Sequence, residues 1–303
     1  MKIFITGGSG FIGQRLNAEL SKKHEILTQY LSNEGNCGKF NSVKADITNT
    51  KILEKIISEF KPDAIIHTAA VSKPGVAEKL GEERVRKINV DASATLARLA
   101  EKHSARIFFF STDLVYDGET PPFKKETEPP NPLSLYARSK AEAEKKIAEN
   151  TENHVILRIA LHFGFSVAGA KSHFSEVYEN LLQNKHVKLF DDQFRTPLEA
   201  TQSAKMLARL LETDVKNEIV NFGGKERVSR YELGEILAEV CGFDKNLLEK
   251  ISLDAVNAQN KVRDVSMNTE KLETFGIERI SLEESIYEIC KNAADKNFQG
   301  IEI

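Results

Sequence analysis

Apolar positions along the chain alternate between short continuous runs and longer stretches with the spacing of an amphipathic helix. The runs are rich in β-branched and aromatic residues, as expected for strands buried on both faces of a parallel sheet. Helical stretches lie between them, and this order predicts a doubly wound, Rossmann-type α/β fold. The predicted strands are residues 1–6, 25–31, 42–46, 64–68, 106–111 and 154–158, and the predicted helices are residues 13–20, 50–60, 83–103 and 135–150.

The regular alternation weakens in the second half of the chain. Residues 117–134 are rich in proline, so we expect an ordered loop there rather than a helix or strand. A helix and a strand within 198–224 are expected to return to the main sheet. We therefore predict a dinucleotide-binding domain of residues 1–160 plus 198–224, and a smaller, mixed C-terminal substrate-binding lobe of residues 161–197 plus 226–303.

Three glycines spaced three residues apart, Gly7, Gly10 and Gly13, separate the first predicted strand from the first helix. In a dinucleotide-binding turn the first glycine permits the tight turn. The second lets the backbone approach a pyrophosphate, and the third lets the helix pack close to the strand. A glycine-rich turn without a ligand would look similar. The position at the first strand favours cofactor binding, and Phe11 and Ile12 join the candidate cofactor residues.

A tyrosine and a lysine, Tyr136 and Lys140, are spaced to share one face of a helix. The lysine charge is expected to lower the pKa of the tyrosine and make it a usable acid or base. Tyr287 and Lys291 repeat the spacing, so spacing alone does not identify a site. Residues 111–113 end a buried strand, where ligands bind in open α/β sheets. Tyr136 follows that strand, so we expect Tyr136 to be functional and Tyr287 to have a packing role.

The glycine motif, the Ser-Thr-Asp sequence at 111–113 and the Tyr136/Lys140 pair together resemble the extended short-chain dehydrogenase/reductases. Three later stretches, at 190–197, 221–232 and 263–272, resemble the dTDP-4-dehydrorhamnose reductase branch of that family. The resemblance covers nearly the whole chain.

The resemblance implies roles for individual residues. Thr112 would hydrogen-bond the substrate oxygen, Tyr136 would donate a proton to a ketone, and Lys140 would bind the nicotinamide ribose. Hydride would pass between the nicotinamide and the sugar carbon. The remaining positions would lie beside the adenine (Asp46 and Ile47), at the cofactor phosphates and ribose (Ala69 and Ala70), in the helix after the fourth strand (Asn89) and near the nicotinamide (Arg158).

Two further residues are candidates for substrate binding. Asp113 follows the candidate threonine directly. Arg195 lies in a turn that ends at Pro197. Two roles are open for its guanidinium, which are binding a diphosphate and forming a surface salt bridge. The substrate implied by the resemblance is a nucleotide-linked sugar.

The chain departs from the reductase pattern on the substrate side. Leu114 replaces an aromatic residue, Leu161 replaces a tryptophan, and Lys261-Val262 replaces an Arg-Pro pair. A sugar-nucleotide epimerase or dehydratase is an alternative, although Leu114 stands where a dehydratase would carry a glutamate. A non-catalytic regulatory subunit is a second alternative, because residues 271–277 are similar to the β-subunit of methionine adenosyltransferase.

The cofactor preference depends on the end of the second strand. Residues 30–33 are uncharged, whereas an acidic residue there would hold a ribose diol and select NAD. Lys39 is a possible partner for a 2′-phosphate. The sequence therefore favours NADP over NAD.

Composition and charge limit the kinds of partner and the location that we expect for the protein. The 303 residues carry a net charge of −3, which gives no reason to expect nucleic acid or an anionic membrane. No apolar run is long enough to cross a bilayer, and the N-terminus lacks a signal-peptide layout. The cysteines, Cys37, Cys241 and Cys290, are odd in number and lack metal-ligand spacing, so we expect reduced thiols, no metal and a cytoplasmic location. The family resemblance suggests a homodimer.

Overall fold

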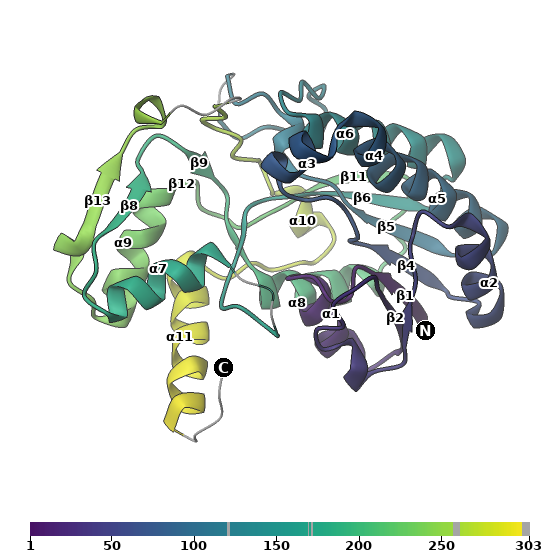
Figure 1. The fold of residues 1–303 in the computed structure, drawn as a ribbon, viewed down its shortest axis with the longest axis horizontal. Coiled ribbons are helices and arrows are strands. Elements are labelled where there is room, and N and C mark those ends of the chain that lie inside the picture. The colour runs from purple at the N-terminus through teal and green to yellow at the C-terminus, as the bar shows by residue number, and fades with distance from the viewer. Residues whose placement is uncertain (120–121, 169, 171, 257–260, 299–303) are drawn as a thin grey trace.

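The computed structural model describes residues 1–119, 122–168, 170, 172–256 and 261–298, with a seven-stranded parallel sheet at its centre (Figure 1). The strand order is β11-β6-β5-β4-β1-β2-β3, and every neighbouring pair is parallel. The predicted fold class is confirmed. The strands are β1 (Lys2–Thr6), β2 (Glu25–Tyr30), β3 (Ser42–Lys44), β4 (Ala64–His67), β5 (Arg106–Phe110), β6 (His154–Ile159) and β11 (Glu218–Phe222).

Helices cover both faces of this sheet because successive strand residues point to opposite sides. Ile3 and Ile5 belong to one apolar core, whereas Phe4 between them belongs to the other. Each core includes apolar residues from the helices on its own side of the sheet (Figure 1). The first core is covered by α1 (Gly13–Leu20), α8 (Ala200–Leu211) and α10 (Lys271–Thr274), and the second by α2 (Thr50–Phe60), α5 (Ala92–Lys102) and α6 (Leu135–Asn150).

The long helix predicted after the fourth strand is interrupted. It consists of α4 (Glu82–Arg86), one π-helical turn (Lys87–Asp91) and α5, and a separate helix α3 (Pro74–Leu80) precedes it. A π turn adds a residue to the helical repeat and often marks a functional site. Asn89 lies within this turn.

Short strands and helices form the smaller lobe, drawn at the left of Figure 1. Its two-stranded sheets are β10-β7, β12-β9 and β13-β8, and its apolar core includes Phe163, Phe174 and Leu237. The elements are β7 (His162–Phe163), α7 (His173–Leu182), β8 (Val187–Phe190), β9 (Phe194–Arg195), β10 (Leu198–Glu199), β12 (Val228–Ser229), α9 (Arg230–Cys241), β13 (Leu248–Ile251) and α11 (Leu282–Phe298).

The segment that includes α10 returns to the large domain. Leu272 and Ile277 are buried in the core beneath the main sheet, and Met267 packs with Tyr116. This part of 226–303 therefore packs outside the lobe, while the predicted domain boundaries themselves stay a prediction.

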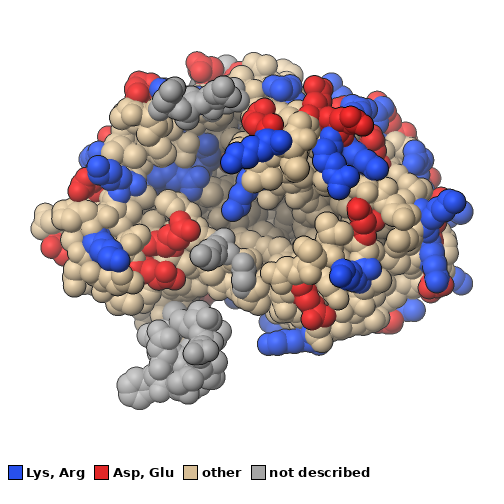
Figure 2. Space-filling view, in the orientation of Figure 1, with Lys and Arg blue, Asp and Glu red and all other residues tan. Residues whose placement is uncertain are grey.

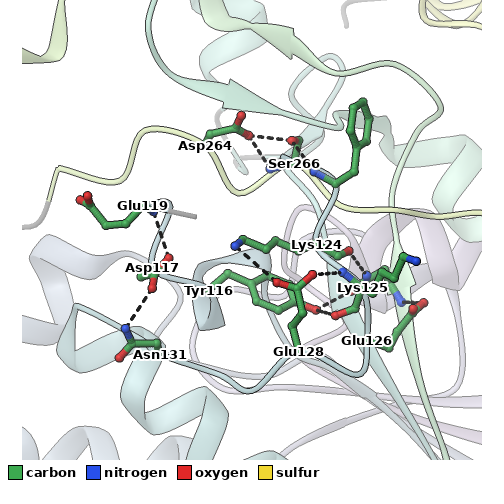
Figure 3. Close-up of polar contacts among 12 residues, drawn as sticks. Tyr116, Asp117, Glu119, Lys124, Lys125, Glu126, Glu128, Asn131, Asp264 and Ser266 are labelled. Carbon is green, nitrogen blue, oxygen red and sulfur yellow. Dashed lines mark hydrogen bonds and ion pairs between the residues drawn. The ribbon is translucent and has the colours of Figure 1, made fainter. Parts of the chain in front are cut away.

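The described part of the proline-rich loop is hydrogen-bonded to the segment that directly precedes α10 (Figure 3). The backbone of Lys124 donates to Ser266 O at 3.0 Å and accepts from Asn268 N at 2.8 Å. The side chain of Asn221 donates to Lys124 O at 2.7 Å, and Tyr116 Oη donates to the carbonyl of Lys125 at 3.0 Å. The loop is ordered by hydrogen bonds to distant parts of the chain.

Within the described part of the chain, no helix is both long enough and apolar enough to cross a membrane. The same residues contain no cluster of three or more His, Cys, Asp or Glu side chains arranged to hold a metal ion.

Candidate active site

The glycine turn connects β1 to α1 as the sequence predicts. Gly7 has a φ of +70°, and Gly10 N donates to Gly7 O at 2.9 Å. A Cβ on Gly13 would lie 2.2 Å from Gly7 O, so packing alone requires glycine there. A Cβ on Gly10 would meet only Gly7 O, at 3.2 Å, and Gly10 faces a cavity. Packing therefore requires glycine less strongly at position 10 than at position 13. This is expected if Gly10 is there to let a ligand approach its backbone.

This cavity has a volume of about 430 Å³ and lies at the carboxyl ends of the central strands. Figure 2 shows a hollow on this face between the large domain and the lobe, with Lys and Arg side chains near its rim. The size is within the usual range of cofactor sites. The predicted cofactor residues that line it are Gly7, Gly10, Phe11, Ile12, Gly13, Asp46, Ile47, Ala69, Ala70, Tyr136 and Lys140.

Asn89 is absent from this lining, although the sequence places it among the cofactor residues. Its side-chain amide accepts from Val71 N at 2.8 Å and donates to Val71 O at 3.2 Å. It also donates to Ser139 Oγ at 2.9 Å, and Ser139 in turn donates to Tyr136 O at 2.7 Å. Asn89 therefore ties a cavity residue, Val71, to the helix that carries Tyr136.

Arg84 lines the cavity near Asp46, and it belongs to none of the motifs described above. Hydrogen bonds from Thr48 hold the pKa of Asp46 below its usual value, and the charges of Arg84 and Lys87 contribute to the lowering. Arg84 forms no ion pair with any residue that the structure describes. Only the fold shows that α4 carries it to the cavity edge.

Thr112 and Tyr136 meet because a strand end and a helix start converge. Thr112 follows β5 and caps a short turn by accepting from Leu114 N at 3.2 Å. Ser134 caps α6 by accepting from Ala137 N at 3.2 Å, which places Tyr136 in the first turn of that helix. The Thr112 hydroxyl is close enough to lower the pKa of the Tyr136 phenol, while Asp113 raises it.

The expected lowering of the Tyr136 pKa by Lys140 is wrong for this structure. Burial raises the pKa of Tyr136 to about 12, and burial lowers the pKa of Lys140 to about 7. Lys140 Nζ lies 3.9 Å from the centroid of the Phe109 ring. Desolvation disfavours the charged form of both groups, and Lys140 is not among the groups that shift the pKa of Tyr136. Tyr136 is held as a protonated phenol at neutral pH.

The second Tyr-x-x-x-Lys pair lies elsewhere. Tyr287 is on α11 and is 57% exposed, so the expected packing role is wrong. Neither Tyr287 nor Lys291 lines the cavity. Of the two pairs, only Tyr136 and Lys140 face the candidate cofactor site.

Asp113 and Arg195 meet on the lobe side of Tyr136. Their side chains are buried, and Arg195 Nε lies 3.6 Å from Asp113 Oδ2, so a surface salt bridge is excluded for Arg195. Burial raises the pKa of Asp113, and Arg195 opposes this shift. Arg230, which the sequence analysis missed, also acts on Asp113, and burial lowers the pKa of Arg230 to about 10. The charge of Asp264 also acts on Arg195, and the Nη atoms of Arg195 donate to the backbone carbonyls of Phe194, Arg263 and Val262. Arg195 and Arg230 therefore belong to a cluster that holds two carboxylates.

A buried polar network lies behind the strand ends. Arg158 Nη2 lies 2.9 Å from Glu144 Oε2, and both side chains are at most 5% exposed. Ser111 donates to Glu144 Oε1 at 2.5 Å, and Arg158 donates to Tyr116 Oη at 2.9 Å. Arg158 is absent from the cavity lining, and its side chain belongs to this network. Its predicted place near the nicotinamide stays a prediction.

Replacing Gly13 tests the close packing of the glycine turn. We expect Gly13→Ala to lower the free energy of unfolding by about 1–3 kcal/mol, because its Cβ would overlap backbone atoms. Gly75→Ala is the matched control, since nothing lies within 4 Å of its Cβ position. Urea unfolding of both variants measures the difference, and equal stabilities would contradict the packing argument.

Removing Arg158 tests the buried network. Arg158→Met leaves the Glu144 carboxylate buried without its partner, so we expect a loss of about 3–5 kcal/mol in the free energy of unfolding. The control is Lys23→Met, which breaks a pair with side chains 73% and 53% exposed. That pair is expected to contribute at most about 1 kcal/mol. Denaturant unfolding compares the two, and a loss for Arg158→Met as small as the control would overturn this assignment.

The fold is the one seen in solved structures of dTDP-4-dehydrorhamnose reductases. Residues 1–294 match the model of the RmlD substrate binding domain, so the chain belongs to that family. Methionine adenosyltransferase 2 subunit beta from Bos taurus is 28% identical over 303 residues, covering 94% of this chain and 87% of its own.

Two other proteins illustrate the range of similarity. The probable low-salt glycan biosynthesis reductase Agl14 from Haloferax volcanii is 29% identical over 259 residues, covering 82% of this chain and 83% of its own. A crystal structure of dTDP-4-dehydrorhamnose reductase from Bacillus anthracis in complex with NADP superposes with a TM-score of 0.84. It is 21% identical and covers 96% of this chain and 99% of its own, which supports the fold alone.

Proposed function

We propose that the protein is an NAD(P)-dependent reductase of a nucleotide-linked keto-sugar, similar to dTDP-4-dehydrorhamnose reductase. The observation that carries this proposal is the position of Tyr136, which lines the cavity and also lies against Thr112 and Asp113. Its phenol therefore stands between a cofactor site and the buried Asp113–Arg195 group. This is the position that a proton donor to a ketone would need.

The cavity suits a dinucleotide for reasons of shape and charge. The Gly10 backbone is open to the cavity, and Lys140 offers a buried amine to a ribose hydroxyl. When bound, the nicotinamide supplies the hydride. Tyr136, protonated because burial raises its pKa to about 12, donates its proton to the carbonyl oxygen as that oxygen gains charge. Thr112 would orient that oxygen through a hydrogen bond.

The substrate's anionic part is assigned to the lobe. Arg195 and Arg230 share Asp113, and Arg230 Nε also donates to Gln193 Oε1 at 3.0 Å. Arginine binds phosphate oxygens through paired N–H groups, which makes these guanidinium groups candidates for binding a diphosphate. In a nucleotide-linked sugar the diphosphate is attached to the anomeric carbon, so it lies one sugar ring away from a ketone at C4.

The reductase is tested with Tyr136→Phe and a panel of nucleotide-linked 4-keto-sugars. NADPH or NADH consumption by the unmodified protein, followed by absorbance, is expected to fall about 10²–10⁴-fold in the variant. Cofactor binding should persist, because the cavity wall keeps its aromatic ring. Tyr287→Phe is the matched control and should keep full activity. Failure to consume cofactor with any sugar of the panel would contradict the proposal.

An epimerase or dehydratase would give product without net consumption of NAD(P)H, so product analysis in the same reactions distinguishes it. The regulatory alternative is favoured by the 28% identity to methionine adenosyltransferase 2 subunit beta over most of both chains. Such a protein would bind a methionine adenosyltransferase catalytic subunit, and this binding would survive Tyr136→Phe.

Arg84 provides a test of the cofactor preference. We propose that NADP is preferred, because Arg84 is a cavity-lining cation without an ion-pair partner among the described residues, and Leu31 provides no acid at the end of β2. Arg84→Ala should weaken NADPH binding about tenfold, as expected for one charge-assisted hydrogen bond, and leave NADH binding nearly unchanged. Arg86→Ala is the control, because Arg86 is paired with Glu142 instead. Equal losses for both cofactors would contradict this assignment.

A further inference from the structure

Two cysteines that are 49 positions apart meet in the smaller lobe. Cys241 is the last residue of α9, and Cys290 lies in α11, which packs against α9. Their sulfur atoms are 2.8 Å apart. This distance is longer than the roughly 2.05 Å of a disulfide bond, and the two sulfurs are in direct contact. Sequence spacing gave no indication of the pair.

The surroundings of the pair exclude a role in the candidate active site. Both cysteines are partly buried at the edge of the lobe's apolar core, near Tyr178 and Phe243. Neither lines the cofactor cavity. No third ligand accompanies them among the described residues, so a metal site is not supported. The third cysteine, Cys37, is buried in the large domain beside Thr28.

We propose that Cys241 and Cys290 are a modification site, at which a low-molecular-weight disulfide such as glutathione disulfide converts the two thiols into an intramolecular disulfide. One thiolate attacks the glutathione disulfide, forming a mixed disulfide and releasing one glutathione thiolate. The second cysteine, deprotonated, attacks the protein sulfur of the mixed disulfide and releases the second glutathione. Both cysteines are oxidised, both halves of the glutathione disulfide are reduced, and the two thiol protons end on the released glutathione.

The contact between the sulfurs brings the second thiol beside the first. The Cys241 thiol donates to Cys290 Sγ at 2.8 Å. Whichever cysteine forms the mixed disulfide, the other is therefore already in place to complete the second step.

The disulfide would join α11 covalently to α9 in the smaller lobe. α11 also reaches the large domain, since Gln202 on α8 donates to Glu288 at 3.0 Å. Near the start of α11, Leu282 N donates to Glu226 at 3.2 Å. A covalent bond between α9 and α11 would restrain the unfolded chain between two cysteines that are 49 positions apart, and a disulfide that closes such a loop stabilises the folded state.

The test uses the purified full chain incubated with glutathione disulfide and then with dithiothreitol. The thiol count under denaturing conditions should fall from three, because the chain has three cysteines, to one, and return to three on reduction. Peptide mapping without reduction should find one cross-linked pair containing residues 241 and 290, lacking two hydrogen atoms. The unfolding midpoint should rise on oxidation and return on reduction.

Variants separate this link from non-specific oxidation. Cys241→Ser and Cys290→Ser should each abolish the cross-linked peptide and the rise in midpoint, while Cys37→Ser should retain both. Retention of three free thiols in the unmodified protein, or a cross-link that involves Cys37, would overturn the proposal. Cofactor consumption serves as a check on folding, because none of the three substitutions falls in the catalytic machinery.

Discussion

The ion pair between Glu144 and Arg158 is the interaction on which the geometry of the site depends. It joins α6, the helix that carries Tyr136 and Lys140, to β6 in the sheet. Through Ser111 it also holds the end of β5, from which Thr112 and Asp113 follow. Burying two charges is expensive unless their hydrogen bonds are satisfied. Here Ser111 and Tyr116 provide the additional bonds, so one network fixes the relative positions of a strand end and a helix start.

Burial also determines the protonation states of the two central groups. Desolvation raises the pKa of Tyr136 and lowers the pKa of Lys140, so each is shifted toward its neutral form. A bound dinucleotide would bring negative phosphates into the same cavity, and negative charge favours a protonated lysine. The lysine charge that the sequence analysis assigns to tuning Tyr136 would therefore depend on the cofactor. The protonated phenol is compatible with the reductive direction in either state.

The sequence predicted the features that depend on neighbours along the chain. The turn at Gly7, the helix start at Tyr136 and the strands of the main sheet are set by local propensity and periodicity, and the structure confirms these elements. Features that depend on tertiary neighbours were missed. Arg84 reaches the cavity only because α4 lies above the strand ends, and Arg230 reaches Asp113 only because α9 starts beside β9. The contact between Cys241 and Cys290 is of the same kind.

The lobe shows why the substrate is harder to infer than the cofactor. Several of its strands, including β7, β9, β10 and β12, have two residues each, which is too short for a period-two pattern to be recognised. The candidate cofactor site uses backbone positions that a glycine motif reveals, whereas the candidate substrate side is built from side chains of separate short elements. Arg195 comes from β9 and Arg230 from the start of α9, and they converge on Asp113 from the large domain. The side chains that would recognise the proposed sugar are therefore positioned by how these short elements pack against the large domain, which sequence periodicity does not encode.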